Sequence, residues 1–260
     1  MSEQNLKGHH ALVCGASRGI GRACAETLAE RGARLTLVAR KTQTLESVRD
    51  ALPGGAGAGH VVLALDLDDT ETLAKRLDAV VEPVHILVNN AGGPPGGPLI
   101  DARPDEFRQG FERLLIAAHL ITQHVVPGMR KAGYGRIINI ISTSVREPIP
   151  GLGVSNTIRA ACAGWAKTLS RELAPDAITI NNVLPGFTAT DRLASLFDAR
   201  AERAGGSREK VEKMALAGVP AGRFAQPAEI AAAVAFLAGP DAAYITGSSL
   251  AVDGGRLHAI

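Results

Sequence analysis

Short apolar segments alternate with longer, alanine-rich amphipathic segments along nearly the whole chain. The apolar segments consist mainly of Val, Ile and Leu, which is typical of strands buried on both faces. We predict strands at Ala11–Cys14, Leu35–Ala39, Val61–Leu65, Ile86–Val88, Ile137–Ile141, Ile178–Val183 and Leu250–Val252. Helical spacing predicts helices at Ile20–Arg31, Thr42–Leu52, Thr70–Val81, Pro104–Lys131, Ser155–Leu173 and Pro227–Leu237. This alternation predicts an α/β fold, a parallel sheet with helices on both faces.

The chain shows no linker that would divide its 260 residues, and we expect a single domain over residues 1–260. Two Gly- and Pro-rich segments, Pro53–Gly59 and Gly92–Pro98, lie between predicted elements and are expected to be loops. Residues Thr188–Val219 interrupt the alternation, because they are long, charged and contain Gly205 and Gly206. This segment is either a lid over a site or a mobile surface segment.

Composition excludes several classes of partner. The net charge is +2 without a basic stripe and aromatic residues make up 3%, so we expect neither nucleic acid nor a membrane surface as partner. No uninterrupted apolar run approaches the ~18 residues of a membrane span. The three cysteines, Cys14, Cys24 and Cys162, are odd in number and lack metal-ligand spacing. They predict a reducing, cytoplasmic environment and no metal site, and the polar first residues do not resemble a signal peptide.

A glycine-rich loop follows the first predicted strand. The sequence LVCGASRGIG ends at Gly21, and its glycines, Gly15, Gly19 and Gly21, lie between the strand and the first turn of the first predicted helix. Glycines there allow a tight turn and a close approach of the backbone to a pyrophosphate, which the positive end of the helix attracts. The position after the first strand predicts a dinucleotide site.

The G-x-x-x-G-x-G spacing resembles that of the short-chain dehydrogenase/reductase family, and further segments resemble it too. Asn89-Asn90-Ala91-Gly92 follows the fourth strand, and Pro185-Gly186 follows the sixth. The segments Pro220–Gly239 and Tyr244–Gly255 are similar to the C-terminal part of 3-oxoacyl-[acyl-carrier-protein] reductases in that family. The resemblance implies a Rossmann-type, doubly wound sheet of about seven parallel strands, with NAD or NADP as cofactor and a dimer or tetramer as assembly.

The end of the second strand favours NADP(H) over NAD(H). Ala39 occupies the place where an acidic residue would bind the ribose 2′-hydroxyl of NAD, and Arg40 and Lys41 follow. The planar guanidinium of Arg40, together with Arg18 from the glycine loop, suits the 2′-phosphate of NADP. The alternative is that Arg40 and Lys41 are simply a solvated pair of surface charges. The resemblance implies these cofactor-binding residues: Gly15, Ser17, Arg18, Gly19, Ile20, Gly21, Arg40, Lys41, Asp66, Leu67, Asn90, Ala91, Gly92, Arg159, Pro185, Gly186, Thr188 and Thr190. Asp66 can instead cap the following helix.

The catalytic positions of the family differ in this chain. The family uses a Ser, a Tyr, a Lys four residues after the Tyr, and an Asn; counted from Gly135-Arg136-Ile137-Ile138-Asn139, these positions hold Ser142, Ser155, Arg159 and Leu114. A serine hydroxyl is far less acidic than a phenol with a pKa of about 10, and arginine does not exchange its proton at neutral pH. Ser155 and Arg159 share one helical face. We therefore expect cofactor binding to persist where the usual proton transfer does not.

Glu147 and Arg192 are further candidates for the missing chemistry. Glu147 is predicted to lie near the substrate, where desolvation would raise its pKa and make it a general acid; the alternative is an exposed residue paired with Arg146. Arg192 either binds an anionic substrate or is a surface charge. Tyr134 and Tyr244 are expected to lie far from the site.

The sequence thus predicts an NADP(H)-dependent oxidoreductase with atypical proton transfer, in which Ser142, Ser155, Arg159 and Glu147 act on a small carbonyl or alcohol substrate. The resemblance suggests a 3-oxoacyl thioester as that substrate. The alternatives are a catalytically silent NADP-binding sensor or partner subunit, and a non-redox enzyme on the same scaffold. We expect a homo-oligomer formed through the helices Pro104–Lys131 and Ser155–Leu173.

Overall fold

All seven predicted strands form, and every neighbouring pair is parallel. In the computed structural model, which describes residues 4–80 and 82–259, the sheet order is β3-β2-β1-β4-β5-β6-β7. Each strand ends within two residues of its predicted bounds. The strands are β1 (His10–Cys14), β2 (Arg34–Ala39), β3 (Val61–Ala64), β4 (Ile86–Asn89), β5 (Gly135–Ile140), β6 (Ile178–Pro185) and β7 (Ser249–Val252). Continuous apolar runs form the central strands because both of their faces are covered.

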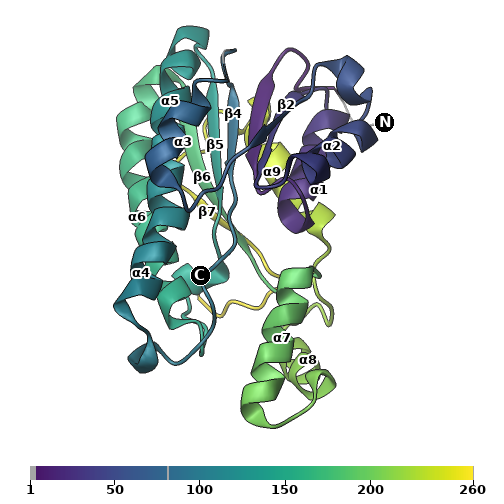
Figure 1. Cartoon of the computed structure of the whole chain (residues 1–260), viewed down its shortest axis with the longest axis vertical. Helices are drawn as coiled ribbons and strands as arrows, with labels where there is room; N and C mark the ends of the chain where they lie inside the picture. The colour runs from purple at the N-terminus through teal and green to yellow at the C-terminus, as the bar shows by residue number, and fades with distance from the viewer. Residues whose placement is uncertain (1–3, 81, 260) are drawn as a thin grey trace.

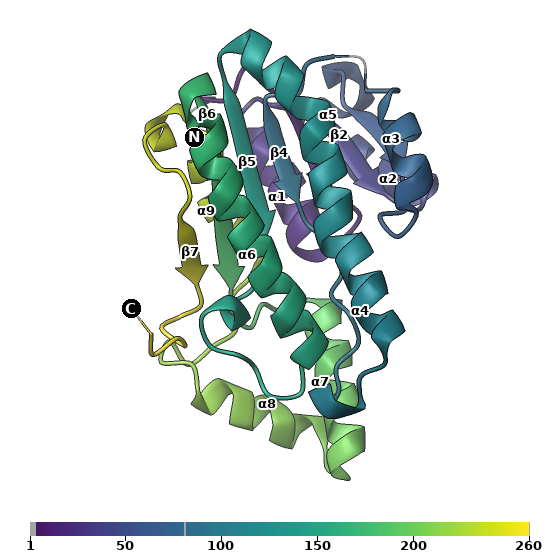
Figure 2. The same ribbon diagram turned by 90° about the vertical axis from the view of Figure 1, so that its left-hand side faces the viewer.

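Helices cover both faces of the sheet (Figures 1 and 2). One face carries α1 (Gly19–Glu30), α2 (Thr42–Ala51) and α9 (Pro227–Ala238), and α1 packs closely against α9. The other face carries α3 (Thr70–Leu77), α5 (Ala117–Ala132) and α6 (Gly153–Leu173). Each face has its own cluster of buried aliphatic side chains, which is how a core with few aromatic residues is filled.

Two predicted helices differ from their observed form. The helix predicted over Thr70–Val81 ends at Leu77, and Val81 itself lies outside the described residues. The helix predicted over Pro104–Lys131 comprises α4 (Pro104–Phe111), a π-helical turn (Glu112–Ile116) and α5. A π-turn inserts one extra residue into the helical ladder, which periodicity alone does not reveal.

The segment predicted as a lid or surface excursion is helical. It forms α7 (Asp191–Ala204) and α8 (Arg208–Ala217), which lie beyond the carboxyl ends of the strands (Figure 1). The two helices bury a small apolar cluster of their own, in which Phe197 packs against Phe187 and Phe224. Within the part of the chain that the structure describes, no helix is long and apolar enough to cross a membrane.

The sheet order places a crevice where β1 and β4 lie side by side. The chain leaves β1 through α1 on one face of the sheet, and it leaves β4 toward α5 on the other face (Figure 1). The loops after the two strands therefore separate at the carboxyl edge, where open α/β sheets bind their ligands.

Candidate active site

A cleft of about 850 Å³ opens at this carboxyl edge. It runs from the glycine loop and the end of β2, past the loop after β4, to the amino ends of α6 and α7. Every residue predicted to bind the cofactor lines this cleft, except Gly21. The same cleft also contains Ser142, Ser155 and Arg159, so the structure brings three of the four predicted catalytic residues together.

The glycine loop requires its glycines. Gly15 and Gly19 have φ angles of +64° and +55°, in the left-handed region that favours glycine. A Cβ on Gly15 would lie 2.5 Å from Asn90 Nδ2, and a Cβ on Gly21 would collide with the Gly15 carbonyl oxygen. Gly21 is buried beneath the loop and does not line the cleft, which corrects its predicted cofactor contact. Its absent side chain instead lets α1 begin close under the loop.

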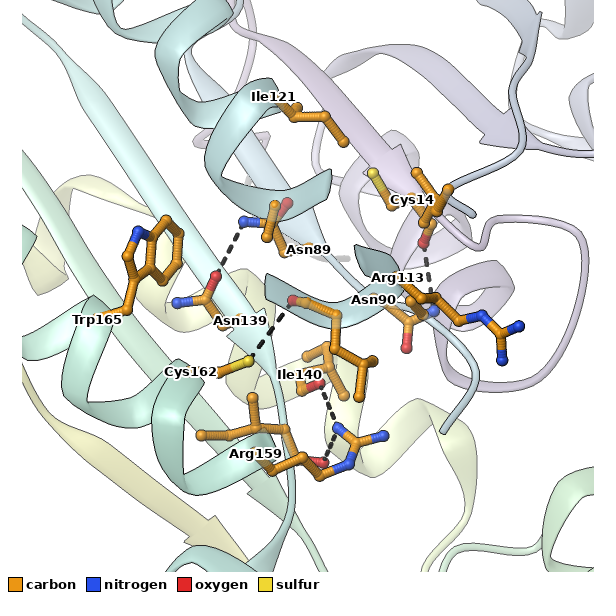
Figure 3. Close-up of a pocket in the computed structure, with 15 residues that line it drawn as sticks. Cys14, Asn89, Asn90, Arg113, Ile121, Asn139, Ile140, Arg159, Cys162 and Trp165 are labelled. Carbon is orange, nitrogen blue, oxygen red and sulfur yellow. Dashed lines mark hydrogen bonds between the residues drawn. The ribbon is translucent and has the colours of Figure 1, made fainter. Parts of the chain in front are cut away.

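Side-chain amides fix the loop after β4. Asn90 Nδ2 donates to the Cys14 carbonyl oxygen at 3.2 Å, which holds this loop against the end of β1 (Figure 3). Below it, buried amides cross the sheet: Asn89 Nδ2 donates to Asn139 Oδ1 at 2.9 Å, and Asn139 Nδ2 donates to Asn182 Oδ1 at 3.0 Å. This row of side chains links β4, β5 and β6. Sequence analysis missed it, although asparagines at the ends of neighbouring strands were a visible signal.

The end of the cleft next to β2 carries unpaired positive charge. The cleft is lined by Arg18 of the glycine loop and by Arg40 and Lys41, which directly follow β2. None of these three forms an ion pair with any residue that the structure describes. Asp69, rather than Asp66, caps α3 by accepting the backbone N–H of Thr72 at 3.3 Å. The residues present fit a nucleotide with a 2′-phosphate, since cations face that end and no carboxylate follows β2 directly.

Arg159 occupies the opposite end of the cleft in a fixed pose. Its Nε donates to Ser155 Oγ at 3.2 Å. Its Nη1 donates to the carbonyl oxygens of Ile140 at 3.2 Å and Ile141 at 2.7 Å (Figure 3). Burial lowers the pKa of Arg159 from its usual value, and the guanidinium of Arg192 adds a smaller effect in the same direction. Ser142 Oγ accepts the N–H of Ser144 at 3.0 Å, so its hydroxyl hydrogen is free to donate.

The expectation for Glu147 is wrong. Its Oε1 accepts the backbone N–H groups of His258 and Ala259, both at 2.7 Å, and its side chain does not line the cleft. These hydrogen bonds lower the pKa of Glu147, the opposite of what a general acid requires. The alternative pairing is also wrong, because Arg146 donates to the Ser249 carbonyl oxygen at 2.8 Å instead.

The two tyrosines lie outside the cleft, as expected. The hydroxyl of Tyr134 donates to the Ala238 carbonyl oxygen at 2.6 Å, and Tyr244 is fully exposed. Sequence analysis missed Arg256 from the C-terminal tail, which also lines the cleft. Its Nη1 donates to Thr143 Oγ1 at 3.0 Å, and no local motif in the sequence indicates this distant contact.

A doubly wound parallel sheet with a glycine-lined cleft at its switch point defines a Rossmann-type dinucleotide-binding protein. A family model described as "Enoyl-(Acyl carrier protein) reductase" matches residues 15–256. The chain belongs to the short-chain dehydrogenase/reductase family, which confirms the resemblance seen in the sequence.

Curated relatives and solved structures agree with this assignment. The chain is 40% identical to "3-oxoacyl-[acyl-carrier-protein] reductase FabG" of Vibrio cholerae over 256 residues, covering 96% of this chain and 98% of that protein. It is 40% identical to the protein of the same name in Escherichia coli, with the same shares covered. The structure of L-sorbose reductase from Gluconobacter frateurii, complexed with NADPH and L-sorbose, matches with a TM-score of 0.91 at 30% identity, covering 99% and 100% of the two chains.

Proposed function

We propose that this protein is an NADP(H)-dependent oxidoreductase that interconverts a carbonyl compound and an alcohol. The observation that carries the proposal is the pair of unpaired guanidinium groups, Arg18 and Arg40, at the adenosine end of a glycine-lined cleft. A planar guanidinium suits a phosphate, and no carboxylate follows β2 to favour a free 2′-hydroxyl. NADPH in the L-sorbose reductase complex supports the same cofactor.

The cofactor, when bound, supplies or accepts the hydride. Gly15 and Gly19 would let the backbone approach the pyrophosphate. Arg159 would donate one of the two free N–H groups of its Nη2 to the nicotinamide ribose at the far end of the cleft. Ser142 and Ser155 offer hydroxyl groups to the carbonyl oxygen. Because Arg159 keeps its proton at neutral pH, the proton must come from water through a serine hydroxyl, which predicts slow turnover.

The substrates to test first are 3-oxoacyl thioesters, for which the 40%-identical relatives are named. We also propose a cytoplasmic homo-oligomer with a small-molecule substrate. Unpaired buried thiols at Cys14, Cys24 and Cys162 are consistent with a reducing compartment. Light scattering of the purified protein measures the assembly directly, and a monomeric mass contradicts the oligomer.

One observation favours a second candidate, a catalytically silent NADP-binding sensor or partner subunit. Two main-chain carbonyl groups and the Ser155 hydroxyl hold the Arg159 guanidinium, and no phenol lines the cleft among the described residues. The oxidoreductase and the silent sensor or partner subunit both require nucleotide binding, but only the oxidoreductase turns over a substrate. A specific rate of about 1 s⁻¹ or more on any carbonyl substrate would exclude the sensor.

Calorimetric titration with NADPH and, in parallel, with NADH tests the shared requirement. We expect NADPH to bind tightly and NADH weakly, and Arg40→Glu to remove the difference. The matched control is Arg31→Glu, which makes the same charge change at the far end of α1 and outside the cleft. If neither nucleotide binds, both candidates are refuted.

A further inference from the structure

Two guanidinium groups from distant parts of the chain converge on Gly93, in the loop after β4. A Cβ placed on Gly93 would lie 3.3 Å from Arg159 Nη2 and 3.9 Å from Arg192 Nη2, with Ser155 Oγ at 3.7 Å. Arg159 comes from α6 and Arg192 from the first turn of α7, and both side chains line the cleft. The absent side chain of Gly93 leaves the space between the two cations open.

Both arginines have donors to spare. Arg192 uses only Nη2, which donates to the Pro94 carbonyl oxygen at 2.8 Å. Arg159 uses Nε and Nη1, so its Nη2 has no hydrogen-bond partner among the described residues. Three guanidinium nitrogens at this end of the cleft are therefore available to a ligand. They are Nε and Nη1 of Arg192 and Nη2 of Arg159.

Negative charge is scarce around these cations. Neither Arg159 nor Arg192 forms an ion pair within the described ranges, and the nearby Arg113 is paired with Asp68 at 2.6 Å. Burial is the main cause that lowers the pKa of Arg192, and Arg113 adds to it as a like charge. Asp191, which also lines the cleft, forms no ion pair in the described residues. Cations left uncompensated beside a cleft attract an anionic ligand.

We propose that Arg192 and Arg159 bind a carboxylate group of the substrate above Gly93. This favours free oxo acids and hydroxy acids over the 3-oxoacyl thioesters named above, whose carboxyl group is esterified and uncharged. This inference rests on the proposed function. A guanidinium fork donates two parallel hydrogen bonds to a carboxylate. Nη2 of Arg192 gives one of its two N–H groups to Pro94, so its second N–H remains free to form such a fork with Nε or with Nη1. Ser142 and Ser155 then face the carbon chain of the same molecule, where the carbonyl or hydroxyl group reacts.

The main competing occupant is the pyrophosphate of the cofactor. The glycine loop already offers an anion site at the amino end of α1, where Gly19 lies under the Thr190 side chain. Arg192 instead extends to Pro94, in the loop after β4. If Arg192 served the pyrophosphate, its loss would weaken NADPH itself, so the two roles are separable by titration.

The test uses probe pairs that differ only in charge. The affinity for NADPH is measured first. Then 2-hydroxybutyrate, 3-hydroxybutyrate and their methyl esters are titrated into the NADPH-saturated protein. An alcohol cannot react with the reduced cofactor, so these titrations measure binding alone. We expect one acid to bind about tenfold or more tightly than its ester, as for charge-assisted hydrogen bonds. Arg192→Gln should remove this preference and change NADPH affinity less than about twofold.

The matched control is Arg200→Gln on the same helix. Arg200 Nη2 donates to the Pro150 carbonyl oxygen at 2.8 Å, as Arg192 does to Pro94, but Arg200 lies outside the cleft. Equal binding of acids and esters, or no acid binding, overturns the carboxylate site. A loss of NADPH affinity in Arg192→Gln assigns Arg192 to the cofactor and also overturns it. Absence of NADPH binding to the unaltered protein refutes the proposed function instead.

Discussion

Arg159 Nε donates to the hydroxyl oxygen of Ser155 at 3.2 Å, one helical turn away on α6. The i, i+4 spacing puts both side chains on the face of the helix that meets the cleft. The two residues form a hydrogen-bonded pair, but neither is a proton donor of useful acidity at neutral pH. Several expectations about activity follow from this pair.

Replacing the pair by the residues that the family resemblance places there should raise turnover. In Ser155→Tyr/Arg159→Lys, a phenol next to an ammonium group can donate a proton, and general acid catalysis contributes about 100-fold or more. The measurement is NADPH oxidation with a 3-oxoacyl thioester and, in parallel, with a free 3-oxo acid. Ser155→Phe/Arg159→Lys is the control, because it fills the same space without a hydroxyl. Equal rates in the tyrosine and phenylalanine variants would contradict the role of the phenol as the proton donor.

Alanine at Gly15 should destabilise the fold and abolish nucleotide binding. The left-handed backbone conformation of Gly15 lowers the free energy of unfolding by about 1–2 kcal/mol when the residue has a side chain. The new Cβ would also clash with Asn90. Urea denaturation measures the loss, and NADPH titration measures the binding. Gly57→Ala is the control, since nothing lies within 4 Å of its added Cβ and its φ is ordinary; it should change stability by less than about 0.5 kcal/mol. Equal effects would refute the steric argument.

Stability should fall as the pH drops from about 6.5 toward 4, because of His10. This buried imidazole contacts Thr36 Oγ1 at 2.8 Å, and burial lowers its pKa to about 4. A histidine with a depressed pKa binds its proton in the unfolded chain first, so acid favours unfolding below the unfolded pKa. The shift corresponds to about 3 kcal/mol. Urea midpoints at pH 7, 6, 5 and 4 measure it. His10→Gln should flatten the dependence, and an unchanged slope would contradict the role of His10.

The Glu147 carboxylate should hold the C-terminal tail, and it should not titrate in catalysis. In Glu147→Ala, the backbone amides of His258 and Ala259 lose their acceptor and should exchange their hydrogens faster. Because the pKa of Glu147 is lowered on folding, this anchoring is present at neutral pH and is lost as acid protonates the carboxylate. Amide exchange of the tail measures the effect. Glu202→Ala on α7 is the control, and unchanged tail exchange in Glu147→Ala would refute the anchor.

The strands and most helices follow from the sequence because they are local patterns. A run such as Ile137–Ile141 is apolar throughout, and only a strand covered on both faces accommodates it. The glycine loop is equally local, since Gly15 and Gly19 lie within five residues of each other between a strand and a helix. These features need no knowledge of where distant segments lie.

The misjudged residues depend on distant parts of the chain. Glu147 is held ionised by amides 111 and 112 residues away in sequence, so its neighbourhood is absent from the local pattern. Arg256 likewise reaches Thr143 across 113 residues. Whether a carboxyl group is desolvated or hydrogen-bonded decides the direction of its pKa shift, and only the folded chain decides that.

The sequence by itself determined the parallel α/β architecture, the family, and the cations in the glycine loop and directly after β2, because short-range periodicity and adjacent residues encode them. The tertiary structure alone decided which side chains share one end of the cleft. Arg159 and Arg192 are separated in the chain, yet Gly93 lies between their guanidinium groups because α6, α7 and the loop after β4 meet at the same edge of the sheet. Proximity of this kind is a property of packing, and it determines the chemistry of the site.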